Sequence, residues 1–198
     1  MKVVARRGFD ATVAEIAKES RVSPRTVFRH YESHDTLIAA TVQDMYEAFG
    51  RPIEDLAPPS DGVEAWIDHL ALTIHTRNVE ILGDAFWDIH APRHNPSAAL
   101  SEMDAFRRAN RVRGIRYLVD TAWQTAGGTG DAPEDLTLAF ALMLSAFATQ
   151  ALVIDFDQRP SEIAPLAADL LKKLLRRAVD GQRPAPDGAS PGADETVP

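Results

Sequence analysis

The stretch Thr12–Tyr31 reads TVAEIAKESRVSPRTVFRHY and decides how the fold of this chain is predicted. Thr12 and Glu15 make a Thr-x-x-Glu capping box, in which each side chain satisfies a free backbone N–H at the start of a helix. After a three-residue break, Ser23 caps a second helix, and Pro24 takes the first helical position, where its missing N–H costs nothing. The stretch therefore predicts two short helices joined by a tight turn.

The second helix has two different faces. Val27 and Tyr31 lie four residues apart and face inward, toward the apolar side of the first helix. The outward face carries Arg25, Thr26, Phe28, Arg29 and His30. A pair of helices held together on one side and polar on the other is the arrangement of a helix-turn-helix, which inserts its second helix into a major groove. Arg25 and Thr26, in its first turn, can reach base edges, and Phe28 can touch a thymine methyl or a sugar.

The longer segment RRGFDATVAEIAKESRVSPRTVFRHYESHDTL, residues 6–37, resembles the DNA-binding signature of the tetracycline-repressor (TetR) family of bacterial transcriptional regulators. The resemblance implies an all-α fold with an N-terminal helix-turn-helix head and a C-terminal helical ligand-binding and dimerisation domain. It also implies phosphate contacts from Thr12, Ser23, His30 and His34. A regulator of this kind is not an enzyme, and it needs no cofactor.

The segment departs from the family pattern in two ways. Residues 1–7 supply barely two turns where the family has a full first helix, so either the true start lies upstream of Met1 or the head is less stable than in its relatives; we favour the first. Arg21 stands in the turn where the family carries a left-handed glycine, which costs on the order of 1 kcal/mol. The Gly8–Val13 spacing is also one residue short.

Charge is distributed unevenly along the chain. The formal net charge is −8 for 198 residues, but residues 1–31 hold seven Lys or Arg and three acids, which leaves −12 for the remaining 167 residues. A basic head on an acidic body confines attraction for DNA phosphates to the head.

Composition excludes several classes of protein. The absence of cysteine excludes disulfides, thiolate zinc sites and cysteine catalysis. No run of 18 uninterrupted apolar residues and no signal peptide occur, so we expect a soluble, cytoplasmic protein without a membrane partner. No nucleophile motif, phosphate loop or metal spacing supports a helical enzyme.

Helical periodicity and breaker residues divide the chain into three parts. We predict a DNA-binding domain over residues 1–49, with its last helix ending near Phe49, and a helical ligand-binding and dimerisation domain over residues 50–181, which begins with the proline-containing segment 50–62. Residues 182–198, rich in Pro, Gly and acids, are predicted to be a disordered tail. Further helices are expected at about 63–77, 79–91, 97–127, 133–156 and 161–180.

The body is rich in aromatic residues, and the family resemblance implies a ligand cavity inside it, with apolar walls and a few polar groups. The candidate lining residues are Trp66, His69, Phe86, Trp87, His90, Phe106, Trp123, Met143 and Phe147. The competing interpretation, favoured for any single residue, is that it is ordinary core.

Two clusters of ionisable residues in the body are interpreted as solvent-exposed residues and not as binding sites. His90 and His94 with Asp84 and Asp88 are better explained as solvated loop residues than as a metal site, because Pro92 interrupts the helix between the histidines. The run Arg107, Arg108, Arg111, Arg113 and Arg116 is best explained as a solvated or ion-paired helix face, with an anionic ligand as the alternative.

The predicted helices 133–156 and 161–180 are apolar on more than one face, and such helices must be buried on all sides. This surplus predicts a homodimer through the last two helices, as the resemblance also implies. We therefore expect a ligand-responsive regulator, most often a repressor, that binds a palindromic double-stranded DNA operator and is released by a small, largely apolar or aromatic effector. The alternative is a dimeric small-molecule-binding protein with weak or lost DNA binding.

Overall fold

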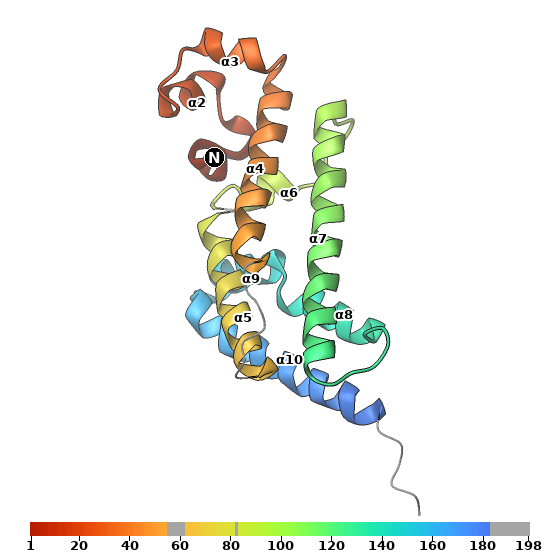
Figure 1. Cartoon of the computed structure of the whole chain (residues 1–198). Coiled ribbons are helices and arrows are strands. Elements are labelled where there is room, and N and C mark those ends of the chain that lie inside the picture. The colour runs from red at the N-terminus through yellow and green to blue at the C-terminus, as the bar shows by residue number, and fades with distance from the viewer. Residues whose placement is uncertain (55–61, 82, 183–198) are drawn as a thin grey trace, which may run out of the picture.

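The computed structural model describes residues 1–54, 62–81 and 83–182, and all regular structure within these ranges is helical, as predicted. The elements are α1 (Lys2–Arg7), the 3-10 turn η1 (Gly8–Asp10), α2 (Val13–Glu19), α3 (Pro24–His30), α4 (His34–Glu54), α5 (Val63–Glu80), α6 (Phe86–His90), α7 (Ala98–Thr125), α8 (Glu134–Met143), α9 (Ala146–Phe156) and α10 (Pro160–Gln182). In Figure 1, α1 to α3 form one end of the molecule, α4 leads into the body, and α10 lies across the far end.

The caps of the helix-turn-helix form as predicted. The Thr12 hydroxyl accepts from the Glu15 N–H at 3.2 Å, and the Glu15 carboxylate accepts from the Thr12 N–H at 2.9 Å. The Ser23 hydroxyl accepts from the Thr26 N–H at 3.1 Å. The turn between the helices places Arg21 at φ 57, in the left-handed region, which confirms the prediction for this residue.

Three helix boundaries differ from the predictions. Helix α4 continues beyond Phe49 to Glu54, and most of the predicted boundary segment 50–62 lies outside the described residues. Helix α5 continues to Glu80, so the predicted helix 79–91 is wrong. Only α6 remains of it, because Gly83, at φ 61, turns the chain against α1. The predicted tail 182–198 lies outside the described residues except for Gln182, the last residue of α10.

The predicted single helix 133–156 is also wrong. The chain breaks at Leu144 and Ser145, so that α9 turns back toward α5. By length and composition alone Glu134–Phe156 could cross a membrane, with a mean hydropathy of 1.9, but its two halves pack against helices of the body. It is therefore weak evidence for a membrane span.

The molecule has a large core in the body and a smaller one in the head. The body core is built around Trp66, Trp123 and Phe140, with α10 packed along α5. The head core joins Val4 of α1 and Ile38 and Met45 of α4 to Ile89 of α6 and Met103 of α7. Because α6 and α7 also belong to the body, the head is fixed directly to the body.

Candidate functional site

Helix α3 presents a mixed basic and aromatic face to solvent. Arg25, Arg29 and His30 are exposed, as is Phe28, with 58% of its surface accessible. Val27, on the opposite side, is buried with Ala17 and Leu37. An exposed phenylalanine between two arginines serves no packing purpose, but it suits a helix that meets the edges of DNA bases.

The predicted phosphate-contacting residues sit at helix starts around this face. Thr12 and Ser23 are exposed N-caps, and the half-buried Thr26 shares a hydrogen bond with the Ser23 hydroxyl at 2.9 Å. His34, at the start of α4, donates through Nε2 to the carbonyl oxygen of Ala11 at 2.7 Å. The structure thus brings the eight predicted residues to one end of the head, and their DNA contacts stay predictions.

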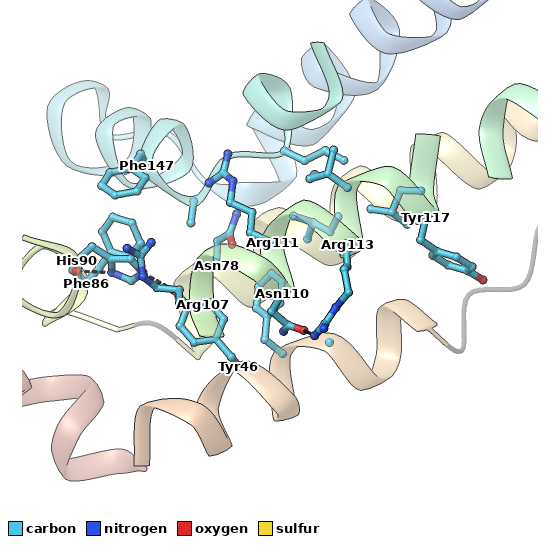
Figure 2. Close-up of a pocket in the computed structure, with 18 residues that line it drawn as sticks. Tyr46, Asn78, Phe86, His90, Arg107, Asn110, Arg111, Arg113, Tyr117 and Phe147 are labelled. Carbon is cyan, nitrogen blue, oxygen red and sulfur yellow. Dashed lines mark hydrogen bonds between the residues drawn. The ribbon is translucent and has the colours of Figure 1, made fainter. Parts of the chain in front are cut away.

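The body contains a cavity of about 540 Å³ between α4, α5, α6, α7 and the start of α9. This volume lies within the range of small-molecule sites. Its walls are formed by Tyr46, Phe49, Gly50, Ile74, Asn78, Phe86, His90, Arg107, Asn110, Arg111, Arg113, Gly114, Ile115, Tyr117, Leu118, Leu144, Ala146 and Phe147. Figure 2 shows these side chains converging from helices far apart in the sequence.

Three of the predicted ligand-binding residues meet in the cavity wall. The Phe86 ring stacks on His90, with ring centroids 4.1 Å apart, and Phe147 meets Phe86 edge-on at 4.9 Å. Trp87 packs on the outer side of this cluster, 5.6 Å from Phe147, and is 44% exposed. The aromatic end of the cavity is therefore assembled from α6 and α9.

The other predicted residues lie away from the cavity. Trp66 and Trp123 are buried in the body core, where the Trp123 indole N–H donates to the carbonyl oxygen of Gly130 at 3.2 Å. Met143 packs against the same core, half-buried. His69 is exposed on α5, and Phe106 is half-buried on α7 outside the lining. These residues were predicted to line the cavity because they are aromatic or lie near aromatic residues, and that property does not distinguish a core residue from a cavity residue.

Several lining residues were not predicted as ligand-binding. Tyr46 and Asn78 carry no distinctive sequence signal. Arg107 and Arg111 are four residues apart, so one helix face carries both, and Gly114 lies on the same helix three residues further on. A Cβ on Gly114 would meet no atom within 4 Å. In the sequence, the feature that could have indicated this wall of the cavity is two arginines and a glycine on one face of a long predicted helix.

Burial keeps the polar pair in the wall neutral. The Nδ1 of His90 donates to the Phe86 carbonyl at 2.7 Å, and its Nε2 accepts from the Tyr46 hydroxyl. Burial lowers the pKa of His90 to about 4. Burial likewise raises the pKa of Tyr46 to about 12, despite the opposing charges of Arg107 and Arg111. Near neutral pH this wall of the cavity therefore carries hydrogen-bonding groups without charge.

Helix α6 connects the cavity to the head. While Phe86 and His90 face the cavity, the Asp88 carboxylate accepts from the Phe9 N–H of η1 at 2.7 Å. A Cβ on Gly8, which has φ 53, would lie 2.0 Å from this carboxylate, so a glycine is required there. The Ala85 N–H donates to Ala5 of α1 at 3.0 Å. A displacement of α6 by a ligand would therefore act directly on α1 and η1.

A resident metal is not suggested by the arrangement of side chains. Across residues 1–54, 62–81 and 83–182, no three His, Asp or Glu side chains come together in a way that could hold a metal ion.

Comparison with known proteins agrees with the fold and the head. The sequence profile of the bacterial regulatory proteins of the tetR family matches residues 1–41, which run from α1 into α4. No curated protein matches the sequence of this chain significantly. Among solved structures, the chain is similar to the transcriptional regulator FadR from Bacillus subtilis, crystallised in complex with stearoyl-CoA. The TM-score is 0.59, at 12% identity over 86% of this chain and 92% of that chain.

The head, the all-helical body and the matching profile define a DNA-binding regulator of transcription, a class without enzymatic activity. Residues 1–41 thus match the tetR family of bacterial regulatory proteins, and the chain as a whole is similar in fold to FadR.

Proposed function

We propose that this chain is a ligand-responsive regulator that binds a palindromic operator as a homodimer and is released, as a repressor, by a small, largely apolar effector. The observation that carries the proposal is the physical connection of the cavity to the head through α6, with Asp88 on Phe9 at one side and Phe86 and His90 at the other. We divide the chain into a DNA-binding part, residues 1–49, and an effector-binding and dimerisation part, residues 50–181. A protein that reads a bacterial operator works in the cytoplasm.

A homodimer is supported by apolar side chains that the single chain leaves uncovered. Leu138 and Leu142 of α8 and Ile154 of α9 are each about 60% exposed. Leu166 of α10 is 60% exposed, and Leu170 and Leu174 continue the row at helical spacing. Large apolar side chains left exposed on three helices are typical of an interface. A two-fold pair of chains would cover these side chains and would place two α3 helices for a palindrome.

Release by an effector needs a difference in effector affinity between two conformations of the dimer. Helix α4 passes from the helix-turn-helix to the cavity, where Tyr46 and Phe49 form part of the wall, and α6 fixes the head from the other side. Movement of either helix would alter the spacing of the two heads. The stearoyl-CoA bound by the structurally similar FadR supports an effector with a large apolar part.

A dimeric small-molecule-binding protein with weak DNA binding is the second candidate. The left-handed Arg21 favours it, because this backbone conformation reduces the stability of the head. The two candidates agree on the cavity and the dimer, and they differ only in whether α3 reads DNA.

The test is a titration of the purified dimer onto the DNA flanking its own gene, at fixed salt with unrelated DNA as competitor. The regulator requires specific binding, together with a steep loss of affinity as salt rises. Equal affinity for flanking and unrelated DNA would instead support the second candidate. The control is Arg25→Ala, which removes a proposed base contact and leaves the cavity intact.

A further inference from the structure

The cavity has two chemically different ends. Aromatic and aliphatic side chains form one end, where Phe86 and Phe147 meet. The α7 wall instead brings three guanidinium groups, from Arg107, Arg111 and Arg113, and none of the lining residues that the structure describes is acidic. Figure 2 shows Arg107 beside the Phe86 and His90 rings and Arg113 turned toward Asn110.

Of these three arginines, only Arg107 is paired with a carboxylate of the described residues. Arg111 donates to the carbonyl oxygen of Ala141 at 2.8 Å, and Arg113 donates to the side-chain oxygen of Asn110 at 3.0 Å. Both acceptors are neutral. The Nε of Arg107 is buried and makes no hydrogen bond to the described residues, and its ion pair with the Asp104 carboxylate is 3.6 Å long.

Three cations of α10 each form a short ion pair with a carboxylate, in contrast to the arginines of the cavity. Lys172 is paired with Asp68, and Arg176 with Glu64, each at 2.6 Å. Lys173 on the same helix is paired with Asp169. Each of these cations has a carboxylate at 2.6 Å, whereas Arg107, with 16% of its side chain accessible, forms a longer ion pair with Asp104 at 3.6 Å. Arg111 and Arg113 are more exposed, and neither is paired with a carboxylate of the described residues, so both can bind an anionic group of a ligand.

Three other polar side chains of the wall are neutral and already hydrogen-bonded within the protein. Tyr46 and His90 satisfy each other and stay neutral, and the Asn78 amide donates to the Thr149 hydroxyl at 2.9 Å. The donors of the wall that carry positive charge are the guanidinium N–H groups, which bind carboxylate and phosphate oxygens.

We propose that the effector is an amphipathic anion, with an apolar body against Phe86 and Phe147 and an anionic group on Arg107 and Arg111. The proposal rests on the effector site proposed above and names its ligand class. Two kinds of ligand combine an alkyl chain with an anionic group. One is a free alkyl carboxylate, and the other is an acyl thioester whose nucleotide phosphates carry the charge.

The test is isothermal titration calorimetry on the full-length protein without DNA, using dodecanoate below its micelle concentration and the neutral dodecanol below its solubility limit. The anion should bind about tenfold or more tightly than the alcohol, because charge-assisted hydrogen bonds are stronger than neutral ones. Arg107→Gln and Arg111→Gln should each remove most of this preference, measured as the ratio of the dodecanoate affinity to the dodecanol affinity of the same variant. Arg108→Gln, on an exposed part of α7 outside the lining, is the matched control and should keep the preference.

A third titration with dodecanoyl-coenzyme A separates the two kinds of ligand. Tighter binding of the thioester assigns the anionic group to the phosphates, and tighter binding of the free acid assigns it to a carboxylate. The proposal is overturned if dodecanol binds as tightly as both anions, if neither anion binds the folded protein, or if both arginine variants keep the preference. Thermal melting of each variant confirms folding. Because no DNA is present, failure of operator binding and failure of this proposal are separate results.

Discussion

The recognition face and the cavity both depend on a helix that carries arginines, but they are assembled over very different stretches of chain. The residues proposed for DNA lie between Thr12 and His34, and two capped helices position them. The cavity wall draws on residues from Tyr46 to Phe147 and on five helices. A local site can be recognised from a local motif, whereas the cavity exists only after the body has packed.

The largest difference between the two regions should appear in stability. Trp123→Ala removes a fully buried indole from the body core and should lower the free energy of unfolding by about 3–5 kcal/mol, because it leaves a cavity. Phe28→Ala in the head removes a ring that is 58% exposed and should change stability little. Urea unfolding followed by circular dichroism compares the two, and equal losses would contradict the assignment of Phe28 to a free surface.

Acidification should act on the body through two buried histidines. Burial lowers the pKa of both His75 and His90 from 6.5 to about 4. The unfolded chain therefore binds these protons more tightly, and stability present above pH 6.5 should fall as the pH drops toward 4, by up to about 3 kcal/mol for each histidine.

Thermal melting between pH 7 and pH 4.5 measures this loss. His75→Asn and His90→Asn should each flatten the pH dependence, and His30→Asn, an exposed histidine of α3, should leave it unchanged. An unaltered slope in both variants would contradict the neutral state of the two buried histidines.

Arg25→Ala should test the recognition face alone. Loss of its fork to a base edge should reduce discrimination between operator and unrelated DNA by about 1–3 kcal/mol without affecting stability. Competition binding measures the discrimination, and Arg108→Ala removes the same charge from the body as a control. A uniform loss of affinity for every DNA would mean that Arg25 contacts a phosphate.

The smallest effect should come from the turn of the head. Arg21→Gly relieves a left-handed conformation at φ 57 and should stabilise the head by about 1 kcal/mol. Asp157→Gly, at φ 52 in the body, should gain less, because aspartate tolerates this conformation better than arginine. Differential scanning calorimetry compares the two, and an equal gain would show that the turn is not specially strained.

Sequence reasoning succeeded where neighbouring residues determine the structure. The capping box at Thr12, the Ser23 cap and the left-handed Arg21 depend on residues a few positions away, and all three predictions are confirmed. It failed where distant packing decides. The pattern of 133–156 is continuous, yet α9 turns away at Ser145, and Thr149 accepts from Asn78 of α5.

The candidate ligand site shows the same limit. Phe86, His90 and Phe147 were predicted and line the cavity, but Trp66 and Trp123 have the same composition signal and are core. The arginines of α7 were interpreted as a solvated or ion-paired face. Only the packing of α4 against α7, with α9 in the wall of the same cavity, shows that Arg107 and Arg111 border a cavity.

The most direct test of the link between the two regions fills the cavity without any ligand. Gly114→Phe places a ring where a Cβ meets no atom within 4 Å, and Gly114→Ala is the matched control that leaves the space open. If cavity occupancy controls the heads, Gly114→Phe should weaken operator binding by about 5–150-fold, the usual range of coupling between sites, while Gly114→Ala binds normally. A folded, dimeric Gly114→Phe protein that binds the operator as tightly as the parent would contradict the account.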